Sequence, residues 1–217
     1  MDKDLMQHWQ AQLQAIAARH AGDDGAHDAN HLQRVWRTAR ALLAAHPEAD
    51  ALVVQAACFL HDIVNLPKDH PHRAQASRLA AETATQELAR IGFASEKLPA
   101  VAHAIAAHSF SAAIAPETIE AQIVQDADRL DALGAVGLAR LFYTAGKMDS
   151  SLAHHSDALA RSRPLDDKAY ALDHIAVKLE TLPASMQTAA GRKLGEERLR
   201  LIHAFRAQFV AEWTDSV

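Results

Sequence analysis

The chain has 217 residues and 49% of them are hydrophobic, so it can bury a sizeable core in one large domain or two small ones. Its formal net charge of −5 argues against a general nucleic-acid-binding surface. The single cysteine, Cys58, excludes an internal disulfide and favours a reducing compartment, so we expect a cytoplasmic protein. The N-terminus lacks an apolar signal core, and no apolar run reaches the roughly 18 residues of a membrane span, so no membrane partner is expected.

The composition predicts an all-α protein, because good helix formers dominate and only 8 Gly and 7 Pro are spread over the chain. No period-2 run indicates a strand. A polar stretch, residues 148–164, is expected to be a mobile insertion or lid. In chain order, helices are expected over residues 4–20, from Asp28 or Asn30 to 45, then 48–64, 73–90 (closed by Gly92), 96–108, 117–145 (one helix, or two that meet near Gly134 and Gly137), 166–182 and 184–213.

The helix expected over 48–64 is apolar nearly all round, which indicates a buried central position. It ends at the adjacent pair His61-Asp62, where an imidazole and a carboxylate can offer two metal-binding atoms from one rigid place. An isolated His-Asp dipeptide more often consists of a helix-capping histidine and a solvated aspartate. The pair therefore indicates a metal site only if other parts of the chain supply further ligands.

Four of the expected helices bring acidic or imidazole side chains to apolar surroundings. Such side chains are costly to bury unless they share a charge partner, and a divalent cation is a common one. Mixed nitrogen and oxygen ligands suit Mn, Fe, Co, Ni or Zn better than Ca. The polar residues on these helices are His31, the pair His61-Asp62, the two histidines His103 and His108, and the aspartates Asp126, Asp128 and Asp131.

Periodicity alone does not choose among these candidates. Asp126 and Asp128 lie about 200° apart around a helix and both flank the apolar stripe, whereas Asp131 lies nearer to it. His103 and His108 are about 140° apart, so at most one points inward unless the helix ends there; we favour His108.

The order of these residues resembles the H…HD…D signature of the HD-domain metal-dependent phosphohydrolases. The flanking words HLQRV, FLHDIV and ADRLDALGAVGLAR are similar too, and the likeness covers roughly residues 27–205. One bacterial subgroup is matched more closely, through HDIV…PK…P…R…AS, AHSFS and the later TAAGRKLGEERL. The resemblance implies one HD-type helical domain over 1–217, with a metal-binding core at about 27–145 and C-terminal helices over 166–213. It also implies metal-dependent attack on a phosphate ester or anhydride.

Carried over position by position, the resemblance implies that His31, His61, Asp62 and Asp128 are the metal ligands, and the A-D-R-L spelling selects Asp128 over Asp126. One divalent ion is expected, with Mn²⁺ first and Mg²⁺, Co²⁺, Ni²⁺, Fe²⁺ or Zn²⁺ as alternatives. A second ion stays an alternative, because His103 and His108 could serve as further ligands. Catalytic roles are expected for Asp62, His108 and Lys68, and substrate-binding roles for Lys68, Arg73, His103, His108 and Asp131.

For the subgroup, the resemblance implies cleavage of a nucleoside triphosphate to the monophosphate and pyrophosphate. Two alternatives remain open. A 5′-nucleotidase would use the same ligands and release inorganic phosphate instead, and a non-catalytic nucleotide- or metal-sensing module would bind without turnover. All three have a small-molecule nucleotide as partner and no nucleic acid.

Overall fold

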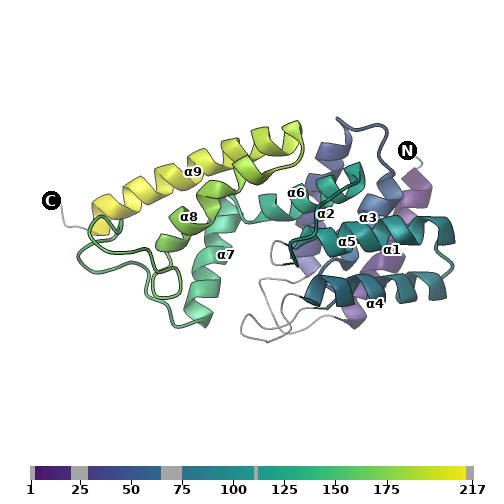
Figure 1. Cartoon of the computed structure of the whole chain (residues 1–217), viewed down its shortest axis with the longest axis horizontal. Coiled ribbons are helices and arrows are strands. Elements are labelled where there is room, and N and C mark those ends of the chain that lie inside the picture. The colour runs from purple at the N-terminus through teal and green to yellow at the C-terminus, as the bar shows by residue number, and fades with distance from the viewer. Residues whose placement is uncertain (1–2, 21–28, 65–74, 110–111, 214–217) are drawn as a thin grey trace. The chain divides into compact units, whose positions relative to one another are not determined.

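The computed structural model describes residues 3–20, 29–64, 75–109 and 112–213, and these residues are helical or irregular without a β-strand. The predicted all-α class is therefore confirmed (Figure 1). The β-type pairing in the described part of the chain is an isolated bridge between Ser151 and Tyr170, outside any strand. None of the described helices is long and apolar enough to cross a bilayer.

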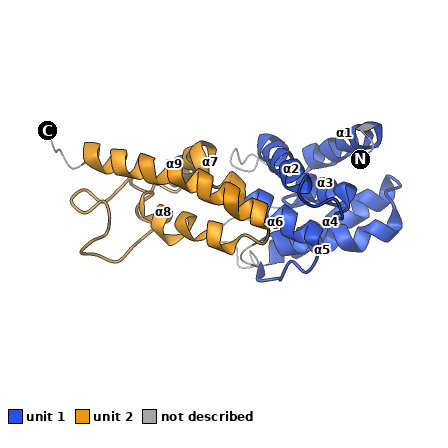
Figure 2. Cartoon of the chain, turned by 90° about the horizontal axis from the view of Figure 1, so that it is seen from above, with its two compact units in different colours: residues 1–128 blue, residues 129–217 orange. Residues whose placement is uncertain are grey.

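Contacts divide the chain into two compact units, residues 1–128 and 129–217 (Figure 2). The expectation of one HD-type domain over the whole chain stays a prediction. The first unit contains α1 (Lys3–Arg19), α2 (Ala29–Leu43), α3 (Ala51–Leu60), α4 (Ala76–Arg90), the 3₁₀ turn η2 (Ser95–Lys97), α5 (Leu98–His108) and most of α6 (Ile119–Asp131). The second contains α7 (Gly134–Lys147), α8 (Asp173–Val177), the 3₁₀ turns η4 (Leu179–Thr181) and η5 (Pro183–Ser185), and α9 (Ala189–Trp213).

Helix α3 is the buried centre of the first unit, as its sequence predicts. Asp50 begins it, because its side chain accepts hydrogen bonds from the backbone N–H groups of Leu52 and Val53. Every residue from Leu52 to Leu60 is buried, and α1, α2 and α5 pack around the helix. The helix ends at His61, so the packing that buries α3 also fixes the His-Asp pair at its C-terminal end.

Two glycines end or divide helices where the sequence predicted. Gly92 has a φ of +77° and follows α4, where the N–H of Phe93 donates to the carbonyl of Leu88. Gly134 has a φ of +75° and separates α6 from α7. Residues 117–145 are therefore two abutting helices rather than one.

Glycines 137 and 146 lie in the same helix, α7, and are expected to respond to alanine with opposite signs. A Cβ at Gly137 would overlap the backbone carbonyl of Ala132, whereas a Cβ at Gly146 would meet open space. We expect Gly137→Ala to destabilise the fold by about 1–3 kcal/mol and Gly146→Ala to be neutral or stabilising by up to about 1 kcal/mol. Urea unfolding of the two variants measures this, and equal shifts would contradict the packing at Gly137.

The helix predicted over 166–182 is wrong. The structure has only the short α8 and the 3₁₀ turn η4 there. Asp166 accepts hydrogen bonds from the N–H groups of Lys168 and Ala169, and Asp173 accepts one from the N–H of Asp166. These local bonds to backbone donors compete with helix formation and keep the segment irregular.

The polar insertion expected over 148–164 is closed by specific bonds. Asp157 accepts from the N–H groups of Arg161 and Ser162 and from the Ser162 hydroxyl, and these bonds lower the pKa of its carboxyl to about 2. The side chain of Arg163 reaches back to the carbonyl of Asp157. Hydrogen bonds among residues 157–163 therefore hold this part of the insertion in a defined turn.

Candidate metal centre

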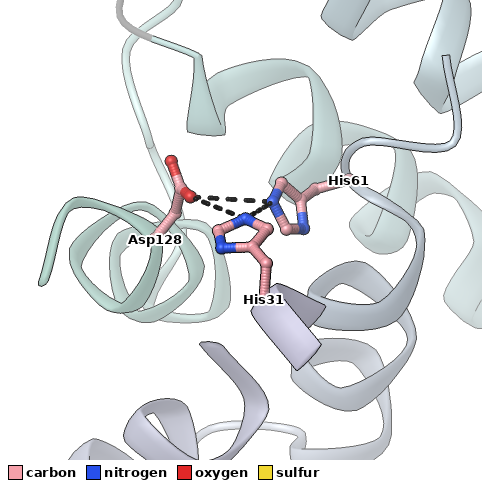
Figure 3. A group of neighbouring side chains, drawn as sticks. All are labelled: His31, His61 and Asp128. Carbon is pink, nitrogen blue, oxygen red and sulfur yellow. Dashed lines mark hydrogen bonds and ion pairs between the residues drawn. The ribbon is translucent and has the colours of Figure 1, made fainter. Parts of the chain in front are cut away.

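Three helices of the first unit bring nitrogen and oxygen donors to one point. His31 comes from α2 and is fully buried, His61 ends α3 and is 1% exposed, and Asp128 lies in the C-terminal half of α6. Figure 3 shows the two rings and the carboxylate pointing toward one another. The Nε2 atoms of His31 and His61 are 3.2 Å apart, and Oδ1 of Asp128 lies 3.4 Å from the first and 3.6 Å from the second.

Asp62 adds a fourth donor beside the same two rings. Its Oδ2 lies 3.7 Å from Nε2 of His31 and 3.5 Å from Nε2 of His61. With metal–ligand bonds of about 2.0–2.1 Å, neighbouring donors around one ion lie roughly 3.0–3.4 Å apart. The observed separations are close to that range, so the four side chains fit a divalent cation in donor type and in spacing.

The backbone sets the orientation of His61. Its Nδ1 lies 3.0 Å from the carbonyl oxygen of Cys58, so Nδ1–H donates to that oxygen. In the neutral ring this leaves the Nε2 lone pair facing the cluster. A backbone carbonyl that holds the far nitrogen is the usual support of a metal-binding histidine.

The electrostatics of the cluster are those of two carboxylates held against imidazole rings. Burial raises the pKa of Asp62, but the rings of His61 and His108 outweigh it and hold that pKa well below its usual range. Burial likewise raises the pKa of Asp128, and hydrogen bonds from His31 and His61 lower it further than burial raises it. Both carboxylates are therefore ionised and available to a cation.

Metal binding is expected to release about one proton at neutral pH. Burial lowers the pKa of His61, but the carboxylates of Asp62 and Asp128 raise it to about 9, so the metal-free ring is protonated. A ligand nitrogen must lose this proton, and the apparent affinity should rise about tenfold per pH unit up to about pH 9. Calorimetric titration with Mn²⁺ in two buffers of different ionisation enthalpy measures the release. A binding enthalpy that is independent of the buffer would contradict it.

A second cluster shares two residues with the first. His108 ends α5, is 7% exposed, and places Nε2 3.7 Å from Oδ1 of Asp62. Its ring lies 4.8 Å from that of His61 in a T-shaped arrangement. Among the described residues, the groups that could hold a metal are thus His31, His61 and Asp128, and His61, Asp62 and His108.

The structure separates the alternatives that periodicity left open. Neither described cluster contains Asp126, which is buried, or Asp131. Asp131 instead pairs with Arg140, at 2.6 Å, in the second unit. His103 is also outside the clusters, and its Nε2 accepts a hydrogen bond from the N–H of Glu117. Lys68 and Arg73 lie outside the described residues.

One residue of the pocket had no role in the sequence analysis. Ser77, in the first turn of α4, lines a small pocket beside His61, Asp62 and His108. A serine at the start of a helix is normally interpreted as part of its N-terminal turn. In the sequence, the feature that could have pointed to Ser77 was its place at the end of the HDIV…PK…P…R…AS pattern that begins with the His-Asp pair.

Comparison with known proteins agrees with this fold. The model of the HD domain matches residues 28–133, and the chain belongs to the HD-domain phosphohydrolase superfamily. It is 34% identical over 194 residues to the uncharacterized protein YpgQ of Bacillus subtilis, covering 88% of this chain and 84% of that one.

Solved structures give the same result. The crystal structure of Bacillus subtilis YpgQ in complex with ADP has a TM-score of 0.71 at 28% identity, with 95% of this chain and 94% of that one covered. An HD-superfamily hydrolase from Bacillus thuringiensis has a TM-score of 0.73 at 27% identity, with 97% and 100% covered. The chain therefore has the fold of the HD-superfamily hydrolases.

Proposed function

We propose that the protein is a divalent-metal-dependent phosphohydrolase that cleaves a nucleoside triphosphate to the monophosphate and pyrophosphate. The observation that carries the proposal is the convergence of the His31 and His61 Nε2 atoms with carboxylate oxygens of Asp62 and Asp128. The complex of the related YpgQ with ADP favours a nucleotide as the substrate class.

In this proposal His31, His61, Asp62 and Asp128 hold one divalent cation, with Mn²⁺ as our first choice. When bound, such a cation supplies Lewis-acid polarisation of a phosphate and a lowered pKa for water. Asp62 has a further role, because its Oδ1 faces His108 while its Oδ2 faces the other two histidines. It therefore links the metal-binding residues to the neighbouring His108.

His108 is proposed to hydrogen-bond the reacting groups. Its Nδ1–H donates to the carbonyl oxygen of Ile105 at 2.6 Å, which fixes the ring and turns Nε2 toward Asp62. Positioned hydrogen bonds of this kind contribute to phosphoryl transfer by orientation rather than by covalent chemistry. The substrate-binding roles of Lys68, Arg73, His103 and Asp131 remain predictions of the sequence.

A nucleotide panel tests the proposal. Purified protein would be stripped of metal, reloaded with Mn²⁺, Mg²⁺, Co²⁺ or Ni²⁺, and assayed separately for phosphate and for pyrophosphate. We expect pyrophosphate and a nucleoside monophosphate from triphosphates. Release of inorganic phosphate from monophosphates would indicate the 5′-nucleotidase reaction instead, and saturable nucleotide binding without turnover for every metal would indicate a sensing module.

A further inference from the structure

The hydroxyl group of Ser77 is buried and has no hydrogen-bond partner among the described residues. Ser77 is only 3% exposed and lies in the first turn of α4. Leaving a buried hydroxyl unpaired is unfavourable, so a group of this kind usually has a small polar partner that is not protein.

The space beside Ser77 has the size of one water molecule. Ser77 lines a pocket of about 20 Å³ together with His61, Asp62 and His108. A water needs roughly 10–15 Å³, so the pocket has room for one oxygen-sized group and not for a phosphate. Through His61 and Asp62 it adjoins the proposed metal ligands. The remaining residues that line it are Val64, Ala76 and Ser109.

The polar groups of this pocket complement a water molecule. Nδ1 of His108 is already bonded to the carbonyl of Ile105, so Nε2 is the ring atom left to bond a water. The Ser77 hydroxyl can donate one hydrogen bond and accept others, and the Asp62 carboxylate offers acceptor oxygens. A water can both donate and accept hydrogen bonds, so it can be held between these three groups.

We propose that Ser77 holds the water that attacks phosphorus, an inference that rests on the proposed phosphohydrolase function. The water oxygen forms a new bond to the α-phosphorus, and the bond from that phosphorus to the bridging oxygen breaks with its electron pair on pyrophosphate. The proton that the water loses passes to solvent through the acceptors that hold it. Ser77 donates to the water oxygen and sets its direction of approach.

Kinetics of Ser77→Ala test the inference. Misplacing a nucleophile by about 1 Å lowers rates up to about 100-fold, so we expect kcat to fall about 10- to 100-fold. KM for the nucleotide and the affinity for Mn²⁺ should stay unchanged, because in this proposal Ser77 bonds the water alone. Ser95→Ala, at an exposed serine of η2, is the matched control and should keep wild-type kinetics. A raised KM with unchanged kcat would overturn the inference by making Ser77 a substrate ligand, and unchanged kinetics would overturn it too.

A high-resolution crystal structure of the metal-free protein tests the water independently of turnover. We expect an ordered water within hydrogen-bond distance of Ser77 Oγ and His108 Nε2, and its loss or displacement in Ser77→Ala. A Ser77 hydroxyl bonded to a protein group, or a dry pocket, would overturn the inference. If the wild-type protein instead holds this water but turns over no nucleotide, the proposed function has failed, and with it the role of the water as nucleophile. Circular dichroism would verify that the variant folds, as expected for a change that leaves no described partner unpaired.

Discussion

Asp62→Asn is expected to abolish metal-dependent turnover while leaving the helical fold intact. The side chain faces His31 and His61 with Oδ2 and His108 with Oδ1, so it joins both clusters of the site. An amide has nearly the same shape but carries no charge, and its oxygen is a weaker ligand for a hard cation. We expect kcat/KM to fall more than about 100-fold, as for the loss of a transition-state-stabilising group, and Mn²⁺ affinity to fall with it.

Asp149→Asn is the matched control for this variant. It removes the same charge at an exposed position after α7, outside both described clusters, and should keep metal binding and activity. Calorimetry with Mn²⁺, pyrophosphate release and the far-ultraviolet circular dichroism spectrum would be measured for both variants. Wild-type turnover by Asp62→Asn in metal-depleted buffer would show that the cluster is not the reaction centre.

Asp173→Ala is expected to give the largest loss of stability among single polar substitutions in the second unit. Asp173 is 2% exposed and accepts two hydrogen bonds from Arg163, at 2.6 and 2.8 Å, and one from the N–H of Asp166. Removing the buried carboxylate takes one acceptor from the Arg163 guanidinium, which is 15% exposed, and one from the N–H of Asp166. Breaking a buried ion pair in this way costs roughly 3–5 kcal/mol.

The control for this variant is Asp167→Ala, seven residues from His174. Asp167 pairs with that histidine at 2.8 Å but its side chain is one-third exposed, and such pairs contribute about 1 kcal/mol or less. Urea unfolding gives the two free energies, and amide exchange over residues 151–175 shows whether the loss is local. Equal losses in both variants would mean that the buried pair does not organise this segment.

Local sequence pattern was sufficient to predict most helices and the candidate site residues that belong to a recognisable motif. Asp50 as a cap and the unbroken apolar run after it identify α3 and place His61 at its end. Gly92 marks the end of α4 through its positive φ. Local pattern failed over 166–182, because helix-forming residues there are overruled by the bonds of Asp166 and Asp173 to backbone N–H groups and Arg163.

By itself, the sequence determined that the chain is all-helical and that it carries candidate ligands at His31, His61-Asp62 and Asp128, in that order. Both conclusions come from apolar periodicity and short motifs, which are local properties of a sequence. Motif spelling favoured Asp128 over Asp126 and the helix end favoured His108 over His103, but periodicity left both choices open. The tertiary structure places Asp128 beside the two rings and His108 beside Asp62. Angular spacing on a helix cannot select between two flanks of one stripe; that selection depends on which neighbouring helix packs against each flank. The unpaired hydroxyl of Ser77 in a water-sized pocket also became visible only once α4 was placed against α3 and α5.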